Sequence, residues 1–112
     1  MPKVEVFELR SFKRARKRFS KKFASLDSNL DDLVDELTQK PTSGESLGAG
    51  LYKVRLAVTS KGGGKSGGFR VITYLVRRSA STTTIYLVIL YDKSEEATLD
   101  KQELLRIVSD YL

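Results

Sequence analysis

Two apolar runs in the second half of the chain, residues 69–76 and 83–90, constrain its fold more than any other feature. Both are rich in β-branched and aromatic residues, and neither shows the polar alternation of a strand with one solvated face. The short polar segment 77–81 between them predicts a hairpin. We therefore expect two central strands of an antiparallel sheet, covered by other elements on both faces.

The first forty residues follow a helical period instead. Aromatic and alanine side chains recur every three or four positions at Phe12, Ala15, Phe19 and Phe23, with Lys and Arg between them. A second apolar stripe runs through residues 26–37; Ser25 or Asp27 can cap it, and Pro41 ends it. These stripes predict a basic helix and an acidic helix that form an antiparallel hairpin.

The remaining segments complete an α+β order. Residues 4–7 are short and β-prone, 41–50 form a turn-rich connection, 51–58 alternate as a strand, and 61–68 are a glycine-rich loop. Thr98 can cap a last helix with a stripe at Leu104, Leu105, Val108, Tyr111 and Leu112. The predicted order is β-α-α-β-β-β-α in a single domain, 1–112, with a mainly antiparallel sheet and the helix hairpin on one side.

Composition excludes several classes of chemistry. The 112 residues contain no cysteine and no histidine, which removes disulfides, thiolate or histidine metal sites and histidine-based catalysis. No apolar segment is long enough for a membrane span, and no secretory signal is apparent at the N-terminus. We expect a cytoplasmic protein without a metal, a cofactor or a membrane partner.

Charge is distributed in blocks around a net value of +6. Residues 1–25 carry nine basic and two acidic side chains, 27–40 carry five acids and one lysine, and 41–93 carry eight basic and two acidic side chains. Such blocks indicate a basic surface suited to a polyanion such as nucleic acid, although a solvated helix face explains them equally well.

Five polar side chains are placed to meet at the strand ends. Lys53 and Arg55 project from the same face of one strand, Arg70 opens the next strand, and Tyr91 and Lys93 end the last one. If the strands pair antiparallel, Arg70 lies near Arg55. Such a cluster could bind a phosphodiester and stabilise a pentacoordinate transition state, although the residues taken alone fit solvated strand ends slightly better.

The glycine-rich loop does not form a nucleotide-binding P-loop. Gly64-Lys65-Ser66 matches the end of that motif, but Thr59 stands where its first glycine is required, and a strand follows instead of a helix. The loop amides and Lys65 could still contact a phosphate, or the loop could be a plain strand connection.

Three blocks of the sequence resemble the RelE/HigB branch of the RelE/ParE toxin superfamily. They are Leu51-Tyr-Lys-Val-Arg55, Gly64-Lys-Ser-Gly-Gly-Phe-Arg-Val-Ile-Thr-Tyr74 and Ile85-Tyr-Leu-Val-Ile-Leu-Tyr-Asp-Lys-Ser-Glu95. The resemblance implies a RelE-like fold and a type II toxin that cleaves mRNA, often on the ribosome, inhibits translation and is neutralised by an antitoxin encoded beside it. It also implies a cleavage that leaves a 2′,3′-cyclic phosphate.

By position, the resemblance assigns catalytic roles to Arg55, Lys65, Arg70, Tyr91 and Lys93, and RNA binding to Lys53, Arg55 and Lys65. Lys61 is a further RNA-binding candidate. The two arginines would contact the phosphate. Lys53, Lys65, Tyr91 or Lys93 would transfer protons, the lysines only if neighbouring cations depress their pKa. The chain departs from some relatives at Ser94, where they have arginine, and at 98–101, where they have tyrosine, which leaves the acid and base assignments open.

Two other functions remain open at this point. A ParE-like relative shares the fold and poisons DNA gyrase without catalysis, but it has no need of converging Lys, Arg and Tyr side chains. A non-catalytic RNA-binding domain is supported by charge alone.

Overall fold

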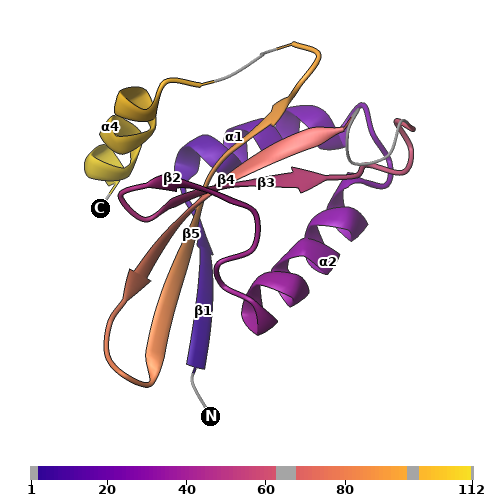
Figure 1. The fold of residues 1–112 in the computed structure, drawn as a ribbon. Coiled ribbons are helices and arrows are strands. Elements are labelled where there is room, and N and C mark those ends of the chain that lie inside the picture. Colours follow the sequence, from indigo (N-terminus) through magenta and orange to yellow (C-terminus); the bar gives the residue numbers. More distant parts are fainter. Residues whose placement is uncertain (1–2, 63–67, 96–98, 112) are drawn as a thin grey trace.

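A five-stranded sheet organises the fold (Figure 1). The computed structural model describes residues 3–62, 68–95 and 99–111. Its elements are β1 (Lys3–Glu8), α1 (Arg10–Ser20), α2 (Leu26–Gln39), β2 (Glu45–Gly48), β3 (Leu51–Leu56), β4 (Phe69–Arg77), β5 (Thr82–Asp92) and α4 (Lys101–Tyr111). The predicted α+β class is confirmed, with one more strand than the sequence suggested.

The strands lie in the order β1-β5-β4-β3-β2. Only β1 runs parallel to its neighbour, β5; the other three pairings are antiparallel. The two apolar runs form β4 and β5, which are flanked by a strand on either side, as expected for central strands.

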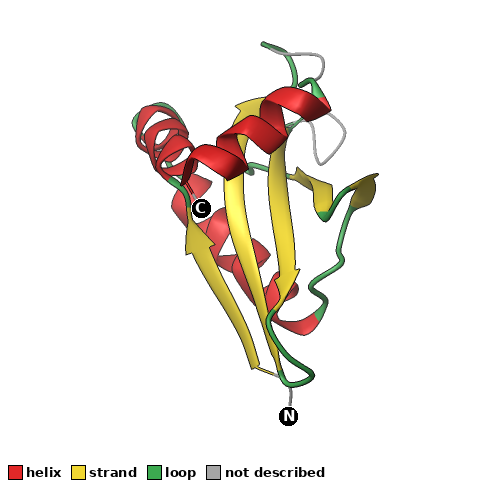
Figure 2. Cartoon of the chain, turned by 90° about the vertical axis from the view of Figure 1, so that its left-hand side faces the viewer, coloured by secondary structure: helices red, strands yellow, loops and turns green. Residues whose placement is uncertain are grey.

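Helices cover both faces of this sheet (Figure 2). On one face, α1 and α2 bury a cluster that includes Phe12, Phe19, Leu30 and Phe69. On the other face, α4 packs Leu104 and Val108 against a second cluster. Burial on both faces explains why β4 and β5 lack polar alternation. No helix in the described segments is long and apolar enough to cross a membrane.

The helix hairpin differs from expectation in its details. Phe23 lies beyond the end of α1 but still packs on the core, with its ring 5.4 Å from that of Phe69. Ser25 precedes α2 but makes no side-chain cap bond; its hydroxyl pairs with that of Ser60 at 2.8 Å. The predicted contributions of Thr98 and Leu112 to the last helix fall outside the described residues.

A guanidinium joins three elements at the base of the hairpin. Arg16 on α1 donates to Glu8 at the end of β1 at 2.6 Å and to Asp27 on α2 at 2.9 Å. Burial works against the charged form, but the hydrogen bond from Arg16 to Asp27 and the charges of both acids raise the pKa of Arg16 overall. Arg16 therefore stabilises the fold by linking β1, α1 and α2.

The segment predicted as a connection, 41–50, contains the short strand β2. It pairs with β3 through a tight turn in which Gly48, Ala49 and Gly50 all have positive φ. Four residues that end in glycine show too little alternation of apolar and polar side chains to predict a strand. Pairing with β3 supplies the stability that their own β propensity lacks.

Gly44, at the entrance to β2, tests this arrangement. It has φ +97°, and a Cβ there would lie 2.5 Å from the carbonyl oxygen of Lys53. We expect Gly44→Ala to lower the free energy of unfolding in urea by about 1–2 kcal/mol for the left-handed backbone and by about 1–3 kcal/mol more for the clash.

Gly62 is the matched control, because it has φ +83° and nothing within 4 Å of an added Cβ. Gly62→Ala should therefore show the backbone cost alone. Equal losses in the two variants would mean that the close approach of Gly44 to β3 does not exist in solution.

Candidate functional site

Three predicted site residues form one row across the sheet. Arg55 on β3 pairs directly with Arg70 on β4, and Arg70 pairs directly with Tyr91 on β5. Directly opposed residues point to the same face of a sheet. The antiparallel pairing that the sequence analysis required is therefore present, and the row lies on the α4 side.

A β-bulge in β5 puts Tyr91 on that side. Thr73 pairs with Leu87 and Ile72 with Ile89, so Val88 is an extra residue on β5. An extra residue reverses the alternation of side chains beyond it. Without the bulge, Tyr91 would point toward α1 and α2. Ser11 on α1 donates a hydrogen bond to the carbonyl of Val88, which holds the bulge in place.

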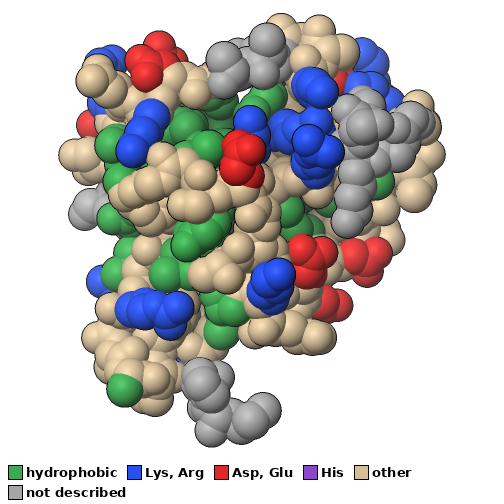
Figure 3. Space-filling model, in the orientation of Figure 1, with side chains coloured by type: hydrophobic (Ala, Val, Ile, Leu, Met, Phe, Trp, Pro, Cys, Tyr) green, Lys and Arg blue, Asp and Glu red, His purple; other side chains and the backbone are tan. Residues whose placement is uncertain are grey.

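The row forms the floor of an open cleft of about 480 Å³. The cleft is lined by Glu36, Gly44, Glu45, Lys53, Val54, Arg55, Arg70, Tyr91 and Lys93. Figure 3 shows Lys and Arg side chains gathered in the upper part of this face, with an acidic side chain among them. Within the described segments, no cluster of acidic side chains could hold a metal ion.

Electrostatics favour an anion in this cleft. Arg70 is 4% exposed, and its guanidinium donates to the carbonyl of Phe69 at 3.1 Å. Like charges placed directly opposite across strands destabilise a sheet, and Arg55 faces Arg70 in this way. A bound phosphate would relieve that repulsion and accept hydrogen bonds from both guanidinium groups.

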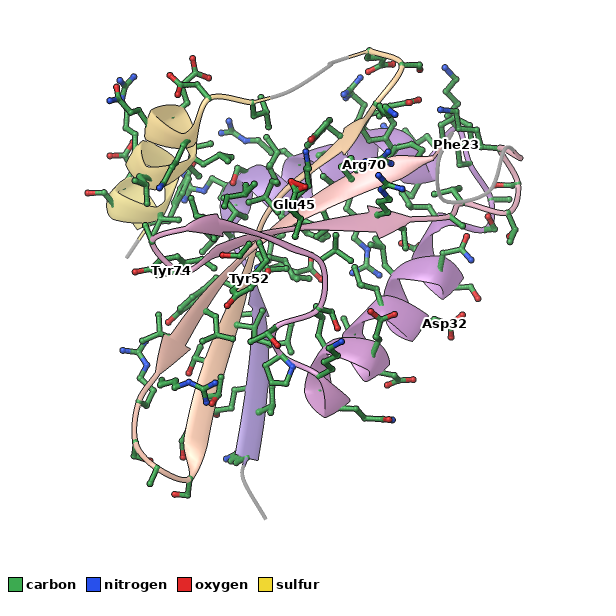
Figure 4. The ribbon with its side chains drawn as sticks, in the orientation of Figure 1. Phe23, Asp32, Glu45, Tyr52, Arg70 and Tyr74 are labelled. Carbon is green, nitrogen blue, oxygen red and sulfur yellow. The ribbon has the colours of Figure 1, made fainter. Side chains whose placement is uncertain are left out.

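Two carboxylates of the cleft were missed by the sequence analysis. Glu45 lies on β2 and Glu36 on α2, and both line the cleft. Figure 4 shows Glu45 extending over the sheet beside Arg70. Its Oε2 lies 3.6 Å from Nζ of Lys53. No signal in the sequence marked Glu45, because the strand that carries it was itself not predicted.

Lys61, predicted to bind RNA, is engaged elsewhere. Its Nζ lies 2.6 Å from Oδ1 of Asp92, and it is absent from the cleft lining. Asp92 pairs in register with Phe69 of the α1–α2 core, so it points to the face opposite Tyr91. The charge of Lys61 therefore fixes the start of the glycine-rich loop to the end of β5.

Asp92 also shapes the turn that presents Lys93. The same Oδ1 accepts hydrogen bonds from the amide of Ser94 at 2.9 Å and from its hydroxyl at 2.8 Å. Burial opposes ionisation, but the bonds from Lys61 and Ser94 outweigh it and lower the pKa of Asp92. Lys93 itself is exposed at the edge of the cleft. Lys65 lies outside the described residues.

Comparison with models of protein families gives one match, over residues 4–109, to the RelE toxin of the RelE/RelB toxin–antitoxin system. The match covers the sheet, the helix hairpin and nearly all of α4. The chain belongs to the RelE toxin family. No individual curated protein matched the sequence.

Membership of the RelE family makes this chain the toxin of a toxin–antitoxin pair, and a cognate antitoxin is its implied partner. The resemblance of the three sequence blocks to the RelE/ParE toxin superfamily is thereby confirmed. The family match spans the cleft residues but assigns no role to any of them.

The Lys61–Asp92 pair yields a prediction about stability and pH. At pH 7 Asp92→Asn should lower the free energy of unfolding by about 1–3 kcal/mol, since it removes a charged acceptor of three hydrogen bonds. A carboxylate with a depressed pKa stabilises the fold above its unfolded-state pKa and loses that contribution as pH falls through the folded-state pKa.

The difference between wild type and Asp92→Asn should therefore be full at neutral pH and should shrink below about pH 4. Urea unfolding at a series of pH values measures it. A difference that is constant down to pH 2 would contradict the ion pair.

Proposed function

We propose that this RelE-family toxin is a metal-independent endoribonuclease that cleaves mRNA on the ribosome and so inhibits translation. The observation that supports it is the row Arg55–Arg70–Tyr91 on the floor of a basic cleft. The cleft offers two opposed guanidinium groups, a phenol and neighbouring lysines, which can bind a phosphodiester. The proposed chemistry therefore uses neither a thiolate nor an imidazole. An open cleft of this size orients the mRNA only in part, so the ribosome would supply the remaining orientation.

The chemistry is an in-line transfer at phosphorus. The substrate's 2′-oxygen attacks the adjacent phosphate while the bond to the 5′-oxygen breaks, which leaves a 2′,3′-cyclic phosphate and a 5′-hydroxyl. Arg55 and Arg70 would contact the non-bridging oxygens, where charge increases in the transition state. The reaction needs one proton acceptor for the 2′-hydroxyl and one donor for the 5′-oxygen.

Glu45 is our candidate for the acceptor. A carboxylate is a common general base, and Glu45 is the carboxylate of the cleft that lies beside Lys53. Glu45 reaches over the cleft, and Lys53 lies at 3.6 Å to orient it. Tyr91 or Lys93, at the end of β5, would return a proton to the 5′-oxygen.

Arg70 and Arg77 provide the main test, because both lie on β4 and carry the same charge. Arg70 faces the cleft, whereas Arg77 is exposed at the far end of the strand. We expect Arg70→Ala to reduce mRNA cleavage in a translation reaction by about 10²–10³-fold and to abolish growth arrest. Arg77→Ala should remain active and toxic.

Because Arg70 is buried, Arg70→Lys serves as a second variant that keeps the charge but loses the planar fork. Both variants should stay folded by circular dichroism and should still bind the antitoxin. Equal cleavage by the Arg70 and Arg77 variants would remove Arg70 from the active site. Gyrase-dependent DNA breaks without RNA cleavage would contradict the proposed function.

A Glu45→Gln variant, compared with a control of equal charge change, tests the proposed role of Glu45 in proton transfer. We expect Glu45→Gln to slow cleavage by about 10²–10⁴-fold, although the loss of an acid should strengthen binding of RNA. Glu103→Gln, an exposed change of equal charge on α4, is the control. Cleavage by Glu45→Gln at the wild-type rate would show that Glu45 only pairs with Lys53.

A further inference from the structure

The bulge at Val88 decides which side chain of β5 completes the row at the cleft. In the observed register, Tyr91 faces Arg70. If β5 continued beyond Leu87 without an extra residue, every later pair would move by one position, and Leu90 would face Arg70 instead. Tyr91 would then point into the apolar core under α1 and α2. The bulge therefore exchanges a leucine for a phenol in the cleft.

The backbone at the bulge is bound by the start of α1, which lies outside the cleft lining. Ser11, in the first turn of α1, donates from its Oγ to the carbonyl oxygen of Val88 at 2.5 Å. The amide of Leu9, just before α1, donates to the carbonyl of Leu87 at 3.0 Å. Successive carbonyls of a regular strand point to neighbours on opposite sides, but these two both accept bonds from the same junction.

The bond from Ser11 favours the bulged register over the regular one. In the regular register the carbonyl of Val88 would turn toward β4, and Ser11 would lose its acceptor. Val88 is 0% exposed, so its carbonyl depends on donors from the protein rather than from water. A bulge also interrupts the hydrogen-bond ladder, so a bond from outside the strand pair has most effect there.

The helix itself does not explain this use of Ser11. Serine near a helix terminus commonly bonds the backbone of its own helix. The hydroxyl of Ser11 instead reaches a residue 77 positions away in the sequence. Its acceptor, Val88, is the residue at which the side-chain alternation of β5 changes.

We propose that Ser11 is a positioning residue for RNA cleavage, because it stabilises the bulge that keeps Tyr91 in the cleft. This inference rests on the proposed function, in which Tyr91 acts beside Arg55 and Arg70. Ser11 belongs to α1, on the other face of the sheet, so it contacts neither the RNA nor the reacting atoms. It acts only through the face on which Tyr91 lies.

The first experiment measures cleavage of mRNA on ribosomes in a single turnover. We expect Ser11→Ala to lower the maximal rate by about 10-fold, which is the effect of one lost hydrogen bond to a buried carbonyl on an equilibrium. The concentration of ribosome complex that gives half the maximal rate should change by less than about 3-fold, because Arg55 and Arg70 still contact the phosphate. Ser11→Thr, which keeps the hydroxyl, should cleave at nearly the wild-type rate.

Ser20→Ala is the matched control, because it removes the same group from the same helix. The hydroxyl of Ser20 donates to the carbonyl of Lys17 within α1, at 3.1 Å. Ser20→Ala should therefore leave cleavage unchanged. Circular dichroism should show that all these variants are folded.

A second comparison places Ser11→Ala in a Tyr91→Phe background. Phenylalanine has no hydroxyl on either face, so Ser11→Ala should slow cleavage there by less than about 2-fold. A further loss as large as in the wild-type background would show that Ser11 stabilises the fold in general, and would overturn the proposal. Cleavage by Ser11→Ala at the wild-type rate would also overturn it.

NMR of the free protein locates the ring of Tyr91 without any cleavage. In the wild type the ring should show nuclear Overhauser effects to methyl groups of Ile72 and Ile89, which lie on the same face. Ser11→Ala should add a population with contacts to Leu56, on the opposite face. Unchanged contacts would overturn the proposal. If the wild type did not cleave RNA, the proposed function would be wrong, and these contacts would still show whether Ser11 sets the face of Tyr91.

Discussion

The pairing of β4 with strands on both sides is the constraint on which the rest of the structure depends. It buries Arg70, the one charged residue of β4 within the apolar part of the strand, between Arg55 and Tyr91. Two guanidinium groups placed directly opposite each other across a sheet repel one another, and Glu36 and Glu45 line the same cleft. The apolar clusters on the two faces of the sheet stabilise the fold and so maintain this unfavourable arrangement at the cleft.

Several basic residues of the chain fall into three sets with different physical roles. Arg16 and Lys61 are held by buried or half-buried carboxylates and join elements that are distant in sequence. Lys53, Arg55 and Arg70 converge in the cleft. Other cations of the first helix and its C-terminal end remain exposed: Lys13, Arg14, Lys17, Lys21 and Lys22. Net charge alone cannot distinguish these sets, because each is defined by its distance from acids and by the face on which it lies.

Several parts of the fold could be predicted because their signals are local. The apolar runs of β4 and β5, the stripes of α1 and α2 and the alternation of β3 each record which side chains are buried. Strand β2 could not be predicted, since four residues are stabilised mainly by their partner strand. Glu45 was missed for the same reason, and Lys61 was placed in the site because sequence proximity to the loop does not reveal that it pairs with Asp92.

The sequence by itself determined the class of the fold, the absence of histidine and cysteine chemistry, and the blocks that place the chain among RelE toxins. These properties depend on composition and on short-range periodicity, which the chain carries before it folds. Only the tertiary structure decided which side chains meet. The register of β3 on β4 opposes Arg55 to Arg70, and one extra residue at Val88 turns Tyr91 toward them. Register and bulges arise from pairing between distant segments, so a single strand does not encode the face on which its residues will act.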